Sequence, residues 1–327
     1  MKILVIRRDN IGDLVCTLPL IRSLREQYPQ AWIGALVTSY NAEVLHANPD
    51  LDAVFAYTKA KHLAAGQSAF GAMWARLRQL WQLRREKIDL VLLPASGAQA
   101  SARRMARLVG AKRVLAQDDV PADPVALHEV LRTANILDAL GISRESLPVA
   151  QIVPRPELLG AAQKKLGTGP VLGLHISARK PSQRWPAERF AELIQRLHVQ
   201  QPALRFALFW APGVADNSLH PGDDGKAQQI LAACSGLPVT PMPTHELAEL
   251  IGGLAACTWI LCSDGGHMHL AAALGKPIVC LFGKSDAARW HPWGVPYQLL
   301  QPASLDVDEL SVEDVLAALS ALPVGGC

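Results

Sequence analysis

A carboxylate near the start of the chain is the first side chain that could do chemistry. It is Asp13, in the stretch Arg8–Asp13 (RDNIGD) that follows the apolar run Ile3–Ile6. Asp13 either caps the next helix, where its negative charge stabilises the positive end of the helix dipole, or acts as a general base at the carboxyl edge of a sheet. The run is not followed by Gly-x-Gly-x-x-Gly, so a dinucleotide fingerprint is not supported.

A glycine pair late in the chain suits an anion. It lies in Ser263–His269 (SDGGHMH), between a strand-like run and a helix. Gly265 and Gly266 would expose backbone N–H groups with no Cβ in the way, as a pyrophosphate requires. Asp264 would hold the loop or cap the helix, and His269, one turn into the helix, would reach the phosphates. The two histidines of this loop are spaced too closely for a helical metal site, and we expect no metal.

A basic loop between these two motifs is the third candidate. The segment Ser177–Arg184 (SARKPSQR) leaves a strand-like run and leads into a helix with Pro186 at its start. Ser177, Arg184 and the cations between them form either a phosphate clamp or a solvated basic loop. Because this loop and the glycine loop both follow strands, we expect them to share one anion site.

A polar loop at 210–224 follows another strand-like run and could contact a nucleoside. It offers Asp216, His220, Asp223 and Asp224 as hydrogen-bond partners.

Short apolar runs alternate with segments of helical period along almost the whole chain. The runs predict strands at Lys2–Arg7, Trp32–Val37, Ala53–Tyr57, Asp89–Pro94, Arg113–Ala116, Val171–Ile176, Phe206–Trp210, Trp259–Cys262 and Ile278–Phe282. The helical period predicts helices at 14–28, Ala69–Lys87, Leu127–Leu140, Pro186–His198, Gly225–Cys234, His245–Ala256, Gly266–Leu274 and Val312–Leu322. In the long helix at Ala69–Lys87, the arginines are expected to face outward and five apolar side chains inward, namely Met73, Leu77, Leu80, Trp81 and Leu83.

Three prolines between Leu147 and Pro156 disfavour both helix and central strand, and we expect the interdomain linker there. Strand–helix alternation on both sides predicts two parallel-sheet α/β domains, 1–155 and 156–327. Two such domains would place a site in the cleft between them, since ligands bind at the carboxyl ends of parallel strands.

Composition excludes several classes of protein. Of the 327 residues, 50% are hydrophobic and 19% charged, so the chain can bury a large core and is not disordered. Apolar runs all stay below the ~18–20 residues that a membrane helix needs. Six cysteines without a Cys-x-x-Cys pair suggest neither a zinc ribbon nor a disulfide framework. We therefore expect a soluble protein of a reducing compartment.

The net charge of +3 is distributed unevenly. Residues 1–160 carry a net +5 and residues 161–327 a net −2, and the stretch from Lys59 to Arg113 holds 12 basic residues but only two acidic ones. This stretch is either a solvated face or the binding surface for an anionic partner, namely a phosphorylated glycolipid, a membrane surface or a nucleic acid.

Taken together, these motifs resemble glycosyltransferase family 9, the bacterial heptosyltransferases of lipopolysaccharide core assembly. The opening KILVIRRDNIGDLVCTLPLIRSLREQYPQAWI is similar to the start of the family, where a strand leads into a Gly-Asp turn. CSDGGHMHLAAALGKPIVCLFGKSD resembles its nucleotide-sugar motif, and SARKPSQRWPAERFAELI resembles a third signature with a basic residue before Trp-Pro. Gly265 and His267 replace the Ser and Pro that are usual in the family.

The resemblance implies a GT-B fold, with the acceptor on the N-terminal domain and the nucleotide sugar on the C-terminal one. It implies an inverting, metal-independent transfer without a cofactor, from an ADP-sugar to a lipopolysaccharide core or related anionic glycan. Heptose is the sugar that the family favours. It places the protein in the cytoplasm, at the inner face of the cytoplasmic membrane, and implies no nucleic-acid partner.

Site residues follow from the resemblance position by position. Asp13 matches the base, and Arg184 matches the basic residue near the leaving diphosphate, where charge develops in the transition state. The donor and phosphate site would comprise Ser177, Arg184, Asp264, Gly265, Gly266 and His269. The carboxylate that the family places after the Trp210 strand falls at Asp223 or Asp224. The basic stretch supplies the acceptor candidates Lys59, Lys61, Arg103 and Arg104.

Two other functions stay open. A nucleotide-sugar epimerase-like enzyme of the same fold would need further acid–base groups in the cleft. A non-enzymatic protein that binds polyanions or anionic lipid through the basic stretch would show steeply salt-dependent binding that does not depend on Asp13.

Overall fold

The structure is a computed structural model that describes residues 1–58, 69–97, 99–125, 127–214 and 222–323. Four residues singled out from the sequence, Lys59, Lys61, Asp216 and His220, lie outside this part of the chain. The chain divides into two compact units, Met1–Val153 and Pro154–Cys327.

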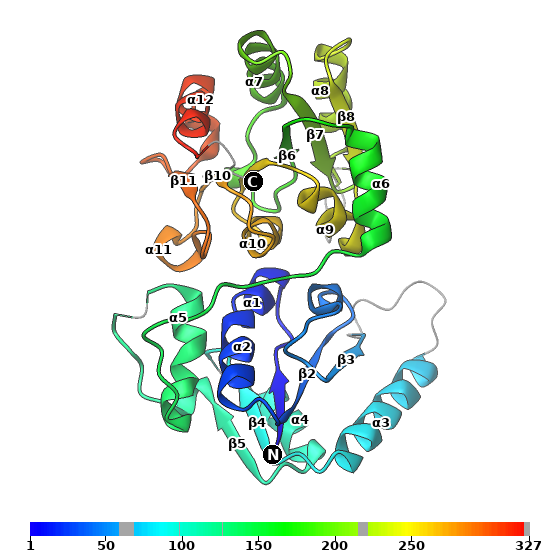
Figure 1. Cartoon of the computed structure of the whole chain (residues 1–327), viewed down its shortest axis with the longest axis vertical. Helices are drawn as coiled ribbons and strands as arrows, with labels where there is room; N and C mark the ends of the chain where they lie inside the picture. Colours follow the sequence, from blue (N-terminus) through cyan, green and yellow to red (C-terminus); the bar gives the residue numbers. More distant parts are fainter. Residues whose placement is uncertain (59–68, 98, 126, 215–221, 324–327) are drawn as a thin grey trace. The chain divides into compact units, whose positions relative to one another are not determined.

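The first unit is built on a five-stranded parallel sheet with the strand order β3-β2-β1-β4-β5. Its strands are β1 Lys2–Ile6, β2 Trp32–Thr38, β3 Ala53–Tyr57, β4 Leu90–Leu93 and β5 Arg113–Ala116. The order places β1, the blue strand, between β2 and β4 (Figure 1). Leu4 lies opposite Gly34 on one side and Val91 on the other. The connections on the two sides of β1 run in opposite directions, so its carboxyl end is the point where such sheets bind ligands.

The helices of the first unit are α1 Ile11–Val15, α2 Leu18–Gln27, α3 Ala69–Arg85, α4 Ala100–Val109 and α5 Glu129–Ala134. The sequence predicted one helix over 14–28, and this was wrong, because α1 and α2 are separate. Pro19 explains the break: it has no N–H to donate to the carbonyl of Val15, and its ring would clash there. Proline is tolerated in the first turn of α2, which Thr17 precedes.

The long helix α3 packs on β3 and α4, and only part of the expected face is inward. Leu80 and Leu83 pack in the core as predicted, and the side chain of Met73 lies outside the described part of the chain. Leu83 is buried, and Gln79 donates a hydrogen bond to the carbonyl of Ala56 at the end of β3. Leu77 and Trp81 are 50% and 57% exposed, so their predicted inward orientation was wrong. The helical period shows which side chains share a face but not which face has a neighbour.

The second unit holds a six-stranded parallel sheet with the order β11-β10-β9-β6-β7-β8. Its strands are β6 Val171–His175, β7 Arg205–Trp210, β8 Val239–Pro243, β9 Trp259–Ser263, β10 Ile278–Leu281 and β11 Tyr297–Leu300. Its helices are α6 Pro156–Leu166, α7 Ala187–Gln200, α8 Asp224–Ala233, α9 Leu247–Ala255, α10 Gly266–Ala273, α11 Ala287–Trp290 and α12 Val312–Ser320. Since β6 lies beside β9, the loops that follow these two strands start next to each other.

Four elements of the second unit were missed by the sequence patterns, namely the short helix α11, strands β8 and β11, and helix α6. Strand β8 contains Pro241 and Pro243, which an edge strand tolerates because one side of it makes no ladder bonds. Strand β11 is the other edge and is half-buried. Pro156, assigned to the linker, instead starts α6, since a first-turn proline loses no intrahelical bond.

Within the described part of the chain, we find no helix with the length and apolar character that crossing a membrane requires.

Candidate functional site

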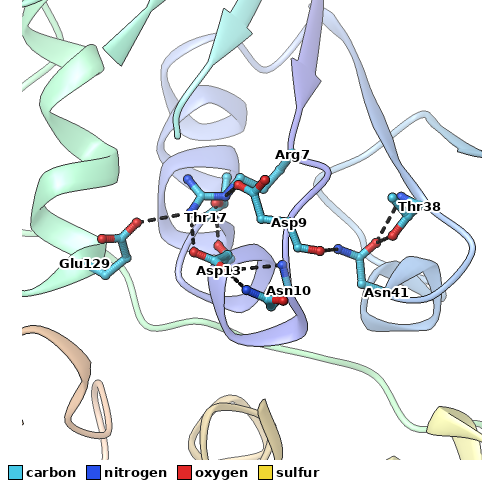
Figure 2. A network of polar contacts seen from close by, with 8 residues as sticks. All are labelled: Arg7, Asp9, Asn10, Asp13, Thr17, Thr38, Asn41 and Glu129. Atoms are coloured by element: carbon cyan, nitrogen blue, oxygen red, sulfur yellow. Dashed lines mark hydrogen bonds and ion pairs between the residues drawn. The ribbon is translucent and has the colours of Figure 1, made fainter. Parts of the chain in front are cut away.

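A buried ion cluster lies at the carboxyl end of β1. The guanidinium of Arg7 is only 2% exposed and faces three carboxylates, those of Asp9, Asp13 and Glu129 (Figure 2). Its Nη2 donates to Asp13 Oδ1 at 2.8 Å and to Glu129 Oε1 at 3.1 Å, and its Nε lies 3.1 Å from Asp9 Oδ2. Burial by itself would lower the pKa of Arg7, but the three carboxylates together raise it above its usual value. Arg7 is therefore a permanent cation.

Asp13 does cap its helix. Its Oδ2 accepts the backbone N–H of Asn10 at 3.2 Å and the Asn10 side-chain amide at 3.0 Å. Its backbone carbonyl accepts the hydroxyl of Thr17, which ties α1 to the start of α2. The capping interpretation is thus realised, and the side chain keeps 15% of its surface exposed at the end of β1. A capping role leaves the second interpretation, a general base, chemically open.

A second loop supports the cluster from the other side. Asn41, fully buried, donates to the carbonyl of Asp9, and its own carbonyl oxygen accepts the N–H and hydroxyl of Thr38 (Figure 2). The end of β2 therefore fixes the backbone that carries Asp9.

Three loops of the second unit meet in one polar junction. Asp264 Oδ2 accepts hydrogen bonds from Gln183 Nε2 at 2.8 Å and from Ser285 Oγ at 2.6 Å. Ser263 Oγ donates to the carbonyl of Gln183 at 2.6 Å. These contacts join the loops after β6, β9 and β10. The structure places Asp264 as a residue that holds loops together, one of the two uses that the sequence allowed it.

Gly283 allows this junction to close. A Cβ on Gly283 would lie 2.0 Å from the carbonyl oxygen of Ser182, so only glycine lets the loop after β10 approach the loop after β6.

Gly265 and His267, the two departures from the family pattern, depend on each other. The ring of His267 stacks on that of His175 at 3.8 Å, and its Nε2 donates to the carbonyl of Ser263 at 2.8 Å. A Cβ on Gly265 would lie 2.7 Å from Cε1 of His267, so glycine makes room for the ring. Burial lowers the pKa of His267 to about 4 and that of His175 well below its usual value. Both rings are therefore neutral at pH 7.

Gly265 is the N-cap of α10 and Gly266 its first residue, which confirms the predicted start of this helix. His269 lies in the same helix but is buried, edge-on to Trp290 with the ring centres 5.9 Å apart. Its ring thus packs inside the second unit.

A group of cations and a serine surrounds the end of β6. Arg184 Nε donates to the carbonyl of Ala178 at 2.8 Å, and Ser177 Oγ accepts the N–H of Ala211 at 2.9 Å. Lys226 Nζ donates to the carbonyl of Ile176 at 3.0 Å. The pKa of Lys226 is lowered to about 8, mainly by burial. The nearby charge of Asp223 opposes this shift, and that of Arg184 adds to it. Lys226 was missed because it lies one turn into α8, far in sequence from the loop it joins.

The two adjacent aspartates at the start of α8 have different surroundings. Asp224 accepts the indole N–H of Trp210 at 2.7 Å and the N–H of Gly213 at 2.9 Å, contacts that lower its pKa. Asp223 is only 7% exposed, and no described residue donates a hydrogen bond to its buried Oδ2. Asp224 therefore holds its loop, whereas Asp223 keeps an oxygen available.

Of the acceptor candidates, the structure describes only Arg103 and Arg104. Arg103 pairs with Asp119 at 2.7 Å, while Arg104 is exposed on α4. Among the residues for which the structure gives positions, no group of three or more His, Cys, Asp or Glu could hold a metal ion.

A model of glycosyltransferase family 9 (heptosyltransferase) matches residues 95–313. The chain belongs to this family. It is therefore a glycosyltransferase, which decides among the three interpretations drawn from the sequence.

Similar proteins of known sequence or structure agree with this membership. Lipooligosaccharide heptosyltransferase 2 of Haemophilus influenzae is 26% identical over 313 residues, covering 88% of this chain and 84% of that protein. A family 9 glycosyl transferase from Veillonella parvula superposes with a TM-score of 0.81 at 20% identity, over 98% of this chain and 96% of that one. An Escherichia coli heptosyltransferase solved with ADP superposes with a TM-score of 0.77 at 19% identity, over 98% of this chain and 99% of that one. These likenesses confirm the predicted GT-B fold of two parallel-sheet α/β domains.

Proposed function

We propose that this glycosyltransferase moves a heptose from ADP-heptose to an acceptor hydroxyl of the lipopolysaccharide core. Family membership and the similarity to a lipooligosaccharide heptosyltransferase support the sugar and the acceptor class. The E. coli heptosyltransferase solved with ADP supports the nucleotide. The observation that carries the proposal is Asp13 itself, a partly exposed carboxylate fixed at the ligand-binding end of the first sheet.

The first unit holds the acceptor in this proposal. Asp13 takes the proton from the acceptor hydroxyl as that oxygen attacks the anomeric carbon, and the bond from this carbon to the diphosphate breaks on the opposite face. The configuration inverts, and ADP leaves with the bonding electron pair.

The second unit holds the donor. Arg184 and Lys226 lie where cations can stabilise negative charge on the leaving diphosphate, together with the N–H groups at the start of α10. This arrangement supplies positive charge without a metal ion or other cofactor.

Asp13→Asn tests the base. The amide keeps the shape and the hydrogen bond to Arg7 but cannot accept a proton, so turnover should fall by about a hundredfold or more. ADP affinity should stay unchanged, because Asp13 lies in the other unit from the proposed donor residues. Turnover is measured as the release of ADP from ADP-heptose with a lipopolysaccharide core acceptor. ADP affinity is measured by isothermal titration. Turnover within twofold of the wild type would remove Asp13 as the base.

We also propose that Asp223, rather than Asp224, accepts hydrogen bonds from the nucleoside. Asp223→Asn should weaken ADP binding about tenfold and leave the melting temperature unchanged or higher, since it removes a buried and incompletely paired charge. Asp224→Asn is the matched control. It should lower the melting temperature and change ADP affinity less than threefold. The opposite pattern in the two variants would exchange their roles.

The exposed face of α3 supports peripheral contact with a membrane. Trp74, Arg78, Trp81 and Arg85 alternate along one exposed stripe, and the guanidinium of Arg85 lies 4.3 Å from the ring centre of Trp81. Tryptophan favours the interfacial region of a bilayer, and arginine pairs with anionic headgroups. We propose that this stripe rests on the membrane that carries the acceptor.

Vesicle flotation tests the stripe. Trp74→Ala/Trp81→Ala should lower binding to phosphatidylglycerol–phosphatidylethanolamine vesicles several-fold, because the two indoles no longer insert at the interface. Val199→Ala, at a highly exposed apolar position on α7, should bind like the wild type. Equal binding of all three proteins would show that α3 does not contact the bilayer.

A further inference from the structure

Three carboxylates surround the guanidinium of Arg7, which is more negative charge than one cation needs for its neutralisation. Asp9 and Asp13 lie within six residues of Arg7, and one of them would balance its charge locally. Glu129 comes from α5, 122 residues away, and its side chain is only 3% exposed. Removing a carboxylate from water costs free energy that a buried ion pair does not reliably return. Stability alone therefore does not explain the third carboxylate.

We propose that Glu129, acting through Arg7, positions the carboxylate of Asp13 and keeps it basic. This inference rests on the proposed function, in which Asp13 is the base. Glu129 is a positioning residue in this account, since it touches Arg7 and not the reacting atoms.

The positioning follows from how the nitrogens of Arg7 are used. Nη2 divides its two hydrogens between Asp13 Oδ1 and Glu129 Oε1 (Figure 2). Asp13 therefore receives a single N–H from Arg7, whereas an arginine with a free fork favours two parallel bonds to one carboxylate. Such a bidentate pair would stabilise the charged form of Asp13 more strongly and make it a weaker base.

The contacts of Asp13 leave room for a substrate. A carboxylate has about four acceptor positions. Asn10 occupies two positions on Oδ2 and Arg7 one on Oδ1. Among the contacts of the described residues, one position on Oδ1 stays available for an acceptor hydroxyl. A second N–H from Arg7 would take it.

The other charged and titratable groups nearby do not replace Glu129. Asp9 faces the Nε side of Arg7 and is 43% exposed. His128 accepts the N–H of Val130 through Nδ1, so this nitrogen is committed to its own helix. The guanidinium of Arg8 lies over the ring of Tyr57, 5.8 Å from its centre.

Glu129→Gln tests the inference with little change in shape, since the amide oxygen can still accept from Arg7. The lost negative charge makes Asp13 less basic, because the positive charge of Arg7 then acts on one carboxylate fewer. We expect the acid limb of the pH profile of kcat to move down by about half a unit to one unit. The plateau of kcat should fall about three- to tenfold, as the Brønsted relation predicts for a weaker base. KM for ADP-heptose and the affinity for ADP should not change.

Glu86→Gln is the matched control. Glu86 pairs with Lys2 at 2.7 Å, at the other end of β1, and its substitution removes the same charge from an ion pair in the same unit. It should leave kcat and the acid limb unchanged. A purely structural role for Glu129 would lower the melting temperature and the active fraction without moving the limb.

The outcomes separate the inference from the proposed function. An unmoved acid limb and unchanged kcat in Glu129→Gln, with Asp13→Asn inactive, would overturn the inference alone. Full turnover in Asp13→Asn would overturn the base and the inference together. If Glu129→Gln does not fold, Arg7→Lys takes its place, because lysine keeps the charge but loses the planar fork. A kcat for Arg7→Lys equal to that of the wild type would then overturn the inference.

Discussion

The buried guanidinium of Arg7 is the constraint on which the first unit depends. A cation removed from water at the end of the central strand is stable only where anions surround it. Asp9 lies in the turn after β1, Asp13 in α1 and Glu129 in α5, so the ion cluster also fixes where these elements lie. Asp13 gains its orientation from the same contacts that Arg7 requires. The same contacts therefore stabilise the fold of the first unit and orient the proposed base.

The second unit fixes its loops by another device. Asp264 accepts hydrogen bonds in the junction from the neutral groups of Gln183 and Ser285. The junction thus holds three loops together while the cations Arg184 and Lys226 bond to backbone carbonyls nearby. Among the contacts of the described residues, neither cation is hydrogen-bonded to a carboxylate, which suits both to an anionic ligand. This agrees with a diphosphate on this unit.

The sequence predicted what depends on neighbours along the chain. Asp13 and the start of α10 at Gly266 could be located because a strand, a turn and a helix follow one another within a few residues. Glu129, Gln183 and Lys226 could not, since each acts on a loop that is distant in sequence. Arg7 was passed over as the end of a strand, and a charged residue that ends an apolar run gives no sign of being buried. The predicted inward orientation of Leu77 and Trp81 was wrong for a different reason, because amphipathic spacing does not show which face of a helix is covered.

Acceptor-dependent release of ADP by the wild-type protein is the direct test of the proposed heptosyltransferase activity. The protein would be incubated with ADP-heptose, with and without a lipopolysaccharide core acceptor, and with a UDP-sugar as the comparison donor. We expect ADP release from ADP-heptose to rise strongly when the acceptor is added, and the UDP-sugar to release no nucleotide at a comparable rate. ADP-heptose left intact by the folded protein in the presence of the acceptor, or faster turnover of the UDP-sugar, would contradict it.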